Sequence, residues 1–134
     1  MLEGVREGLE RHEWRTHGTC SGLDDDAYFR AAIDAAVFDG ARVLELGGGT
    51  GVLSCFAAKR ASKVWCVEFN PDMVDEARRL LAFNENGHKV EVVHADAFEY
   101  LPPEPVDVVI CEMIHVAMLR EKQVEVINAF KQRY

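Results

Sequence analysis

The feature that most constrains the fold of this chain is the segment Val-Leu-Glu-Leu-Gly-Gly-Gly-Thr-Gly at residues 43–51. Its first four residues are typical of a strand, and the four glycines among the next five residues predict a turn whose backbone can pass close to a ligand. A helix is expected from about residue 52. The turn would then offer backbone N–H groups and the positive end of a helix dipole to a polar or anionic ligand.

The spacing of the glycines narrows the class of ligand. Gly47, Gly49 and Gly51 follow the pattern G-x-G-x-G. The dinucleotide fingerprint G-x-G-x-x-G/A would need a small residue at the position that Val52 occupies. No Gly-Lys-Ser/Thr follows, so the segment is not a phosphate loop of the P-loop type. A doubly wound domain that binds another nucleoside remains open on these residues alone.

A second apolar segment, residues 63–68, ends in the acid Glu68. This carboxylate lies about 20 residues past the glycines, where a doubly wound fold places an acid on a ribose diol. Asn70 and Pro71 then predict the start of a helix, with Asn70 as the N-cap and Pro71 at the first helical position.

Strands and helices alternate along the rest of the chain, which predicts a parallel sheet. The expected strands span about 42–47, 63–68, 89–94 and 106–111, and the expected helices about 2–14, 24–38, 51–60, 71–84 and 117–134. The last helix is expected to pack through Val124, Ile127 and Phe130. Residues 108–111 are all apolar, which predicts burial of that strand on both faces.

Composition and charge exclude several classes of protein. One domain is the default for 134 residues of which 49% are hydrophobic. We divide the chain into a helical or extended segment, 1–22, and a ligand-binding domain, 23–134. No apolar stretch approaches a membrane span, and the N-terminus lacks the apolar core of a secretion signal. The four cysteines show no C-x-x-C pair and no metal spacing, which favours the reducing cytoplasm. The net charge of −8 argues against a broad phosphate-binding surface and suits a basic substrate better.

Three segments together resemble the cofactor motifs of class I S-adenosylmethionine-dependent methyltransferases. They are residues 43–51, Val-Glu-Phe-Asn-Pro at 67–71 and His-Ala-Asp-Ala at 94–97. The resemblance implies an α/β fold, a three-layer Rossmann-like doubly wound sheet that is mostly parallel. We expect only the first four of the family's seven strands, in spatial order 3-2-1-4, so that the domain is short at its C-terminus.

The same resemblance implies S-adenosylmethionine as the cofactor and assigns roles to six residues. Glu45 would orient the glycine loop or the cofactor's amino group, and Gly47, Gly49 and Gly51 would let its methionine portion approach. Glu68 would hold the ribose hydroxyls, and Asp96 would bind the adenine amine. We therefore expect a methyltransferase that acts on a nitrogen acceptor.

The segment Cys-Glu-Met-Ile-His at residues 111–115 is the candidate for contact with the methyl acceptor. It resembles the substrate loop of protein arginine methyltransferases. In that family a second glutamate follows nine residues later, and Glu121 stands nine residues after Glu112. Two carboxylates suit the planar guanidinium fork, so we take Glu112 and Glu121 as the catalytic candidates. Glu121 is equally explained as a first-turn helix acid favoured by the helix dipole. The family's closing barrel and T-H-W loop are absent from this sequence.

Several alternatives remain open. Residues from 111 to 124 also resemble small archaeal-type predicted RNA methylases, so the acceptor is a protein or an RNA. A non-catalytic cofactor-binding or assembly half-domain is favoured by the missing strands. Residues 12–20, His-Glu-Trp-Arg-Thr-His-Gly-Thr-Cys, resemble a motif of the secretory acid ribonucleases, but Thr16 replaces the lysine of that motif. Those residues are otherwise expected to lie over the cofactor pocket or to pack on it.

The fourth strand also predicts an assembly. An all-apolar strand at 108–111 would leave unpaired N–H and C=O groups at the edge of the sheet, which native proteins avoid. We therefore expect a homodimer, formed through the edge of this strand or through the last helix, and no membrane partner.

Overall fold

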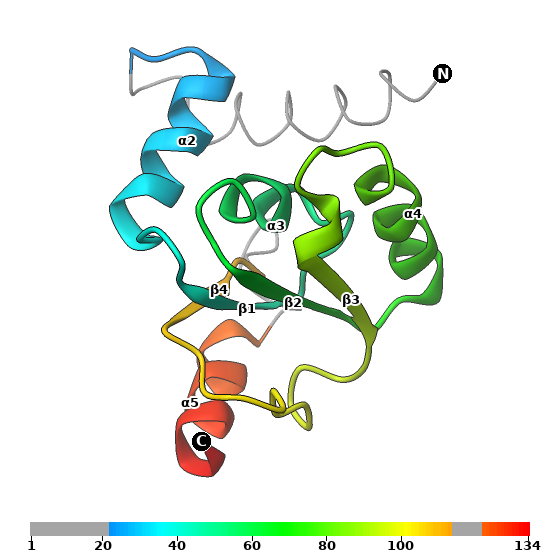
Figure 1. Ribbon diagram of the computed structural model, residues 1–134. Helices are drawn as coiled ribbons and strands as arrows, with labels where there is room; N and C mark the ends of the chain where they lie inside the picture. The colour runs from blue at the N-terminus through cyan, green and yellow to red at the C-terminus, as the bar shows by residue number, and fades with distance from the viewer. Residues whose placement is uncertain (1–21, 114–121) are drawn as a thin grey trace.

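A four-stranded parallel sheet lies at the centre of the computed structural model, which describes residues 22–113 and 122–134 (Figure 1). The strands are β1 (Arg42–Leu46), β2 (Lys63–Glu68), β3 (Val90–His94) and β4 (Val108–Cys111). β1 pairs with β2 and β4, and β2 pairs with β3, which gives the order β3-β2-β1-β4. The predicted order 3-2-1-4 and the parallel α/β fold are therefore confirmed.

The helices form two layers on the sheet. One face carries α2 (Asp25–Ala36), α3 (Val52–Ala57) and α4 (Pro71–Leu81), whereas α5 (Gln123–Arg133) lies on the other face (Figure 1). A 3-10 turn, η3 (Gly87–Lys89), precedes β3. The helix expected at 2–14 lies outside the described residues. Within those residues no helix is both long and apolar enough to span a bilayer.

Local capping sets where two of these helices begin. The Asp24 carboxylate accepts a hydrogen bond from the N–H of Ala27 at 2.8 Å and starts α2. Asn70 does the same for α4, since its side-chain oxygen accepts from the N–H of Asp72 at 2.9 Å and Pro71 follows it. The N-cap predicted at Asn70 is therefore confirmed.

Alternation along the strands divides the core into two parts, because successive side chains of a strand point to opposite faces of the sheet. On the face that carries α2 and α3, Val43 and Val64 pack with the buried helix residues Phe29, Ile33 and Phe56. On the opposite face a second buried cluster joins the strands to α5, and it comprises Leu44, Leu46, Trp65, Val67, Ala97, Val126 and Phe130.

The predicted packing face of α5 is wrong at one position. Val124 is 67% exposed, and the residue that fills the core is Val126, with an exposure of 0%. Phe130 is buried as expected. Valines at both positions offered the same hydrophobicity, and only the rotation of the docked helix decided which of them points to the sheet.

The expected burial of the fourth strand on both faces is confirmed only in part. Val108 and Ile110 pack against the cluster on one face of the sheet, and Val109 and Cys111 pack against the cluster on the other. All four residues of β4 are half-buried. The reason is that β4 pairs with β1 alone among the described strands and therefore lies at the edge of the sheet.

The two valines of α5 provide a test of this packing. We expect Val126→Ala to lower the free energy of unfolding by about 2 kcal/mol, because the truncation leaves a cavity in the core beneath the sheet. Val124→Ala, the same change on the exposed side, should alter it by less than about 0.5 kcal/mol. Urea denaturation of both variants measures the difference, and equal losses would contradict the observed docking of α5.

Candidate functional site

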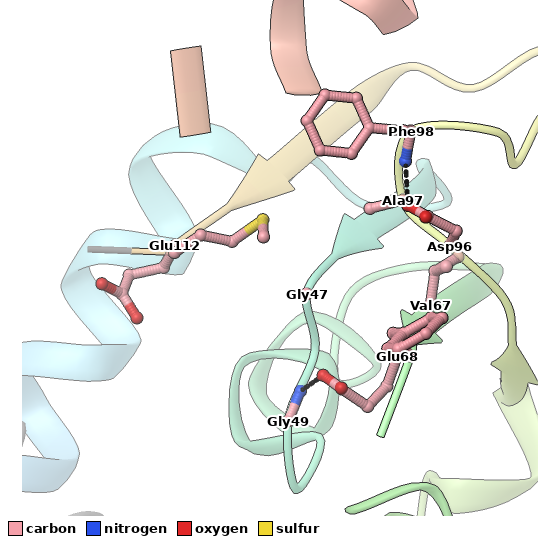
Figure 2. Close-up of a pocket in the computed structure, with 10 residues that line it drawn as sticks. Gly47, Gly49, Val67, Glu68, Asp96, Ala97, Phe98 and Glu112 are labelled. Carbon is pink, nitrogen blue, oxygen red and sulfur yellow. Dashed lines mark hydrogen bonds between the residues drawn. The ribbon is translucent and has the colours of Figure 1, made fainter. Parts of the chain in front are cut away.

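A pocket of about 500 Å³ opens at the carboxyl ends of the strands (Figure 2). Its walls come from four segments: the glycine turn after β1, residues 67–69 at the end of β2, residues 96–98 after β3 and residues 112–113 after β4. Ligands of doubly wound sheets bind at this end of the strands, beside the point where the strand order reverses. The sheet reverses its order at β1, so the pocket lies where such a ligand is expected.

The glycine turn packs directly on β2. Gly47, Gly49 and Gly51 have φ values of 75°, 53° and 77°, which side-chain-bearing residues rarely adopt. The N–H groups of Gly47 and Gly48 both donate to the carbonyl of Val67 at 2.9 Å. A Cβ atom at Gly48 would come within 2.3 Å of the Cys66 sulfur. The turn therefore needs glycine both for its backbone angles and for its close approach to β2.

Glu68 connects the end of β2 to the glycine turn. Its Oε2 accepts from the N–H of Gly49 at 2.9 Å (Figure 2). Its Oε1 accepts from the N–H of Asn70 at 2.7 Å. A carboxylate oxygen can accept two hydrogen bonds, so each oxygen retains the capacity for a ligand hydroxyl. The side chain is thus held rigidly while it lines the pocket.

Asp96 stands on the same wall as Glu68 (Figure 2). Its Oδ1 accepts from the N–H of Phe98 at 2.8 Å, and its carbonyl accepts from the N–H of Tyr100 at 2.9 Å. The first bond forms an Asx turn and the second a backbone turn, and together they fix the loop after β3. Each carboxylate oxygen of Asp96 retains the capacity to accept a further hydrogen bond.

Glu45 lies beneath the glycine turn and does not line the pocket. It is 3% exposed and accepts a hydrogen bond from the Ser54 hydroxyl of α3. Burial raises the pKa of the Glu45 carboxyl to about 7, although hydrogen bonds from Ser54 and the Cys66 thiol oppose the shift. A carboxyl oxygen of Glu45 lies 3.4 Å from the position of a Cβ on Gly48. The side chain therefore packs against the turn from below.

Of the two residues predicted to contact the methyl acceptor, the structure describes only Glu112. Glu112 is exposed and lines the pocket on the side opposite Glu68 and Asp96 (Figure 2). Glu121 lies outside the described residues, as does the ribonuclease-like segment 12–20. The described part of the site therefore brings together the glycine turn, Glu68, Asp96 and Glu112, with Glu45 behind the turn.

Five hydrophobic residues also line the pocket, and the motif analysis assigned a role to none of them: Val67, Phe69, Ala97, Phe98 and Met113. Phe69 directly follows Glu68, and Phe98 stands two residues after Asp96. This closeness in sequence to the two acids was the signal that could have identified both rings. The Met113 side chain lies so close to Gly47 that a Cβ atom added to Gly47 would be 2.7 Å from the Met113 Cγ. Its N–H donates to the Gln123 side-chain oxygen of α5 at 3.0 Å, a contact that no local pattern predicts.

The pocket is acidic. Three carboxylates line it, on Glu68, Asp96 and Glu112, and none of the described lining residues is Lys or Arg. Across residues 22–113 and 122–134, no group of three or more His, Cys, Asp and Glu side chains could hold a metal ion. The electrostatic field inside the pocket therefore favours cations and hydroxyl or amine donors over phosphates.

Comparison with known proteins yields consistent matches over this region. A family model described as "Methyltransferase domain" matches residues 43–133. An uncharacterized protein of Methanocaldococcus jannaschii is 36% identical over 107 residues, which cover 80% of this chain and 41% of that protein. Protein arginine N-methyltransferase PRMT10 of Arabidopsis thaliana is 36% identical over 111 residues, or 81% of this chain and 29% of that protein.

The fold has similar solved structures. The Trypanosoma brucei PRMT1 enzyme-prozyme heterotetrameric complex with AdoHcy matches with a TM-score of 0.71 and 27% identity, over 92% of this chain and 38% of that one. The chain thus spans less than half the length of each of these relatives.

The buried Glu45 predicts a pH dependence of stability. Its pKa in the folded protein is about 7 against an ordinary 4.5, so between these values the folded state holds a proton that the unfolded state has lost. The contribution of Glu45 to the free energy of unfolding is therefore fully present below pH 4.5, the pKa of the unfolded state, and is lost as pH rises through 7. The change amounts to about 3 kcal/mol. Glu45→Gln keeps the shape and removes this titration.

The measurement is urea unfolding of both proteins at about pH 5 and about pH 8. The difference in unfolding free energy between the glutamine variant and the unmodified chain should shift in favour of the variant as pH rises. A difference that does not change with pH would show that Glu45 is ionised throughout.

Proposed function

Because this chain belongs to the methyltransferase-domain family, we propose that it binds S-adenosylmethionine and transfers its methyl group to a nitrogen acceptor, with an arginine-like guanidinium favoured. The observation that carries this proposal is the pocket beside the glycine turn, with its three carboxylates and no lining Lys or Arg among the described residues. A nucleoside with a diol, an exocyclic amine and a positive sulfonium complements these charges. Phosphorylated nucleosides do not, because their charge repels the carboxylates.

Different residues of the pocket bind different parts of the cofactor. The Glu68 oxygens accept from the two ribose hydroxyls, since each has a remaining acceptor position beside its backbone donor. Asp96 accepts from the adenine amine. The glycine turn lets the methionine portion approach, because Gly47 and Gly49 have no side chain in the way.

The bound cofactor supplies a methyl group on a positive sulfur. Glu112, across the pocket from Glu68, accepts from the N–H groups of the acceptor and orients its nitrogen toward that methyl group. Glu121 would complete a pair of carboxylates for the planar guanidinium fork. Met113 and Phe98 line the pocket with apolar surface and exclude water from it. The gain in rate then comes mainly from proximity and orientation.

RNA is the weaker acceptor candidate. A net charge of −8 and an acidic pocket oppose the approach of a phosphate backbone. The named arginine methyltransferases among the relatives support the guanidinium instead.

A non-catalytic cofactor-binding or assembly domain is the second candidate function. It is favoured by one neighbour, the Trypanosoma brucei complex of an enzyme with a prozyme. It predicts that the chain binds cofactor but transfers no methyl group by itself.

Two variants should separate cofactor binding from methyl transfer. Glu68→Ala should weaken binding of S-adenosylhomocysteine by roughly 1.5–3 kcal/mol in calorimetry, because charged hydrogen bonds to the ligand are lost. Glu91→Ala, which removes an exposed acid of β3 paired with Lys63, is the matched control and should bind normally. Glu112→Gln should keep cofactor affinity and lose transfer of radiolabelled methyl groups to arginine-containing peptides.

Each outcome contradicts a different part of the proposal. An unmodified chain that binds no S-adenosylhomocysteine would contradict the cofactor, and full turnover by Glu112→Gln would contradict the guanidinium contact. Transfer to RNA but not to peptides would favour the RNA methylase.

We also propose that the protein is a cytoplasmic homodimer. Among the described residues Cys66 and Cys111 are free thiols, which fits a reducing compartment. The outer edge of β4 has no partner among the described strands, and its apolar residues are half-exposed. A second copy that pairs with this edge, or packs on α5, would satisfy the unpaired backbone groups.

Light scattering at micromolar concentration tests the assembly. We expect the mass of a dimer, with an interface of at least ~1,000 Å². A stable monomer over a wide range of concentration would contradict the proposal.

A further inference from the structure

The Phe69 side chain lines the pocket although its own packing does not hold it in place. It directly follows Glu68, at the junction of β2 and α4, and it is 69% exposed. An aromatic ring with so little buried surface has few contacts to fix its position. The backbone on either side therefore sets the direction of the Phe69 Cα–Cβ bond, and with it which side-chain rotamers place the ring against the pocket.

Three hydrogen bonds hold this backbone. The N–H of Ala95 donates to the carbonyl of Glu68 at 3.1 Å, and the N–H of Asn70 donates to the Glu68 side chain at 2.7 Å. The third joins the imidazole Nε2 of His94 to the carbonyl of Phe69 at 2.9 Å. A carbonyl only accepts, so Nε2 of His94 carries the proton.

The bond from His94 differs from the other two. It is the only one of the three made by a side chain that does not line the pocket, and it holds the carbonyl of the Phe69–Asn70 peptide, whose N–H donates to Glu68. The sheet brings the two together, because His94 is the register partner of Glu68 at the ends of β3 and β2. The His94 side chain therefore bonds not to Glu68, its partner in the sheet, but to the carbonyl of the following residue, Phe69.

We propose that His94 is a positioning residue, which holds the Phe69 ring as one wall of the nucleoside site. The proposal rests on the proposed function, since it assigns the ring to the flat base of the cofactor. A base stacks on an aromatic face, and stacking is stronger when the backbone already directs the ring to the pocket, because less freedom is lost on binding. His94 supplies this preorganisation without touching the ligand.

The test is the affinity for S-adenosylhomocysteine, measured by calorimetry on the whole chain. Removing a single neutral hydrogen bond in His94→Ala should weaken binding by roughly 3- to 10-fold. His94→Gln places an N–H donor at a similar reach and should restore the affinity to within about 2-fold. His88→Ala is the matched control, because this exposed histidine bonds the carbonyl of Glu85 in the turn before β3 and lines no part of this pocket.

A double-mutant cycle with Phe69→Ala separates positioning from a general structural role. If His94 acts through the ring, His94→Ala should cost nothing further once the ring is gone. The melting temperature of each variant shows whether it is folded, and the glutamine variant provides the comparison if the alanine variant is not.

The results that overturn the inference are distinct from failure of the proposed function. An unmodified chain that binds no S-adenosylhomocysteine removes both. Normal binding by His94→Ala, an equal loss with and without the Phe69 ring, or a comparable loss in His88→Ala removes the positioning role and leaves the cofactor assignment standing.

Discussion

The carboxylate of Glu68 is the link on which the pocket depends. With one oxygen it holds the N–H of Gly49 in the turn after β1, and with the other it holds the N–H of Asn70 at the start of α4. The glycine turn, which is 19 residues away in sequence, is thereby joined to the junction of β2 and α4. Such charge-assisted bonds are stronger than neutral ones, so the acid that we assign to the ribose is also the residue that gives its own pocket a fixed shape.

The glycine turn is supported from below as well as from its rim. Gly48 lies on the sulfur of Cys66, and behind it the carboxyl group of Glu45 is buried against Ser54. A buried acid with a pKa of about 7 can be neutral under the turn, where an ionised one would need a partner charge. The arrangement places the negative charges on the open side, where Glu68, Asp96 and Glu112 line the pocket.

The charge of the pocket, more than its shape, determines which class of ligand it favours. A site whose described lining residues include no Lys or Arg opposes phosphate, whichever nucleoside the phosphate belongs to. The glycine spacing had already pointed away from dinucleotides and nucleoside triphosphates, so two independent observations favour the same kind of ligand. The family match over residues 43–133 agrees with both.

The sequence by itself determined the features that depend on neighbouring residues. Glycines at 47, 49 and 51 demanded a tight turn, Asn70 with Pro71 started a helix, and the alternation of strands and helices predicted a parallel sheet. The order β3-β2-β1-β4 was expected from the resemblance of the motifs to a known family. The sequence also named Glu68, Asp96 and Glu112, which the structure places around one pocket. Only the tertiary structure decided which valine of α5 enters the core, that Gln123 meets Met113, and that His94 holds Phe69. These contacts join segments that are distant in the chain or depend on how a helix turns when it docks, and no local pattern of residues contains that information.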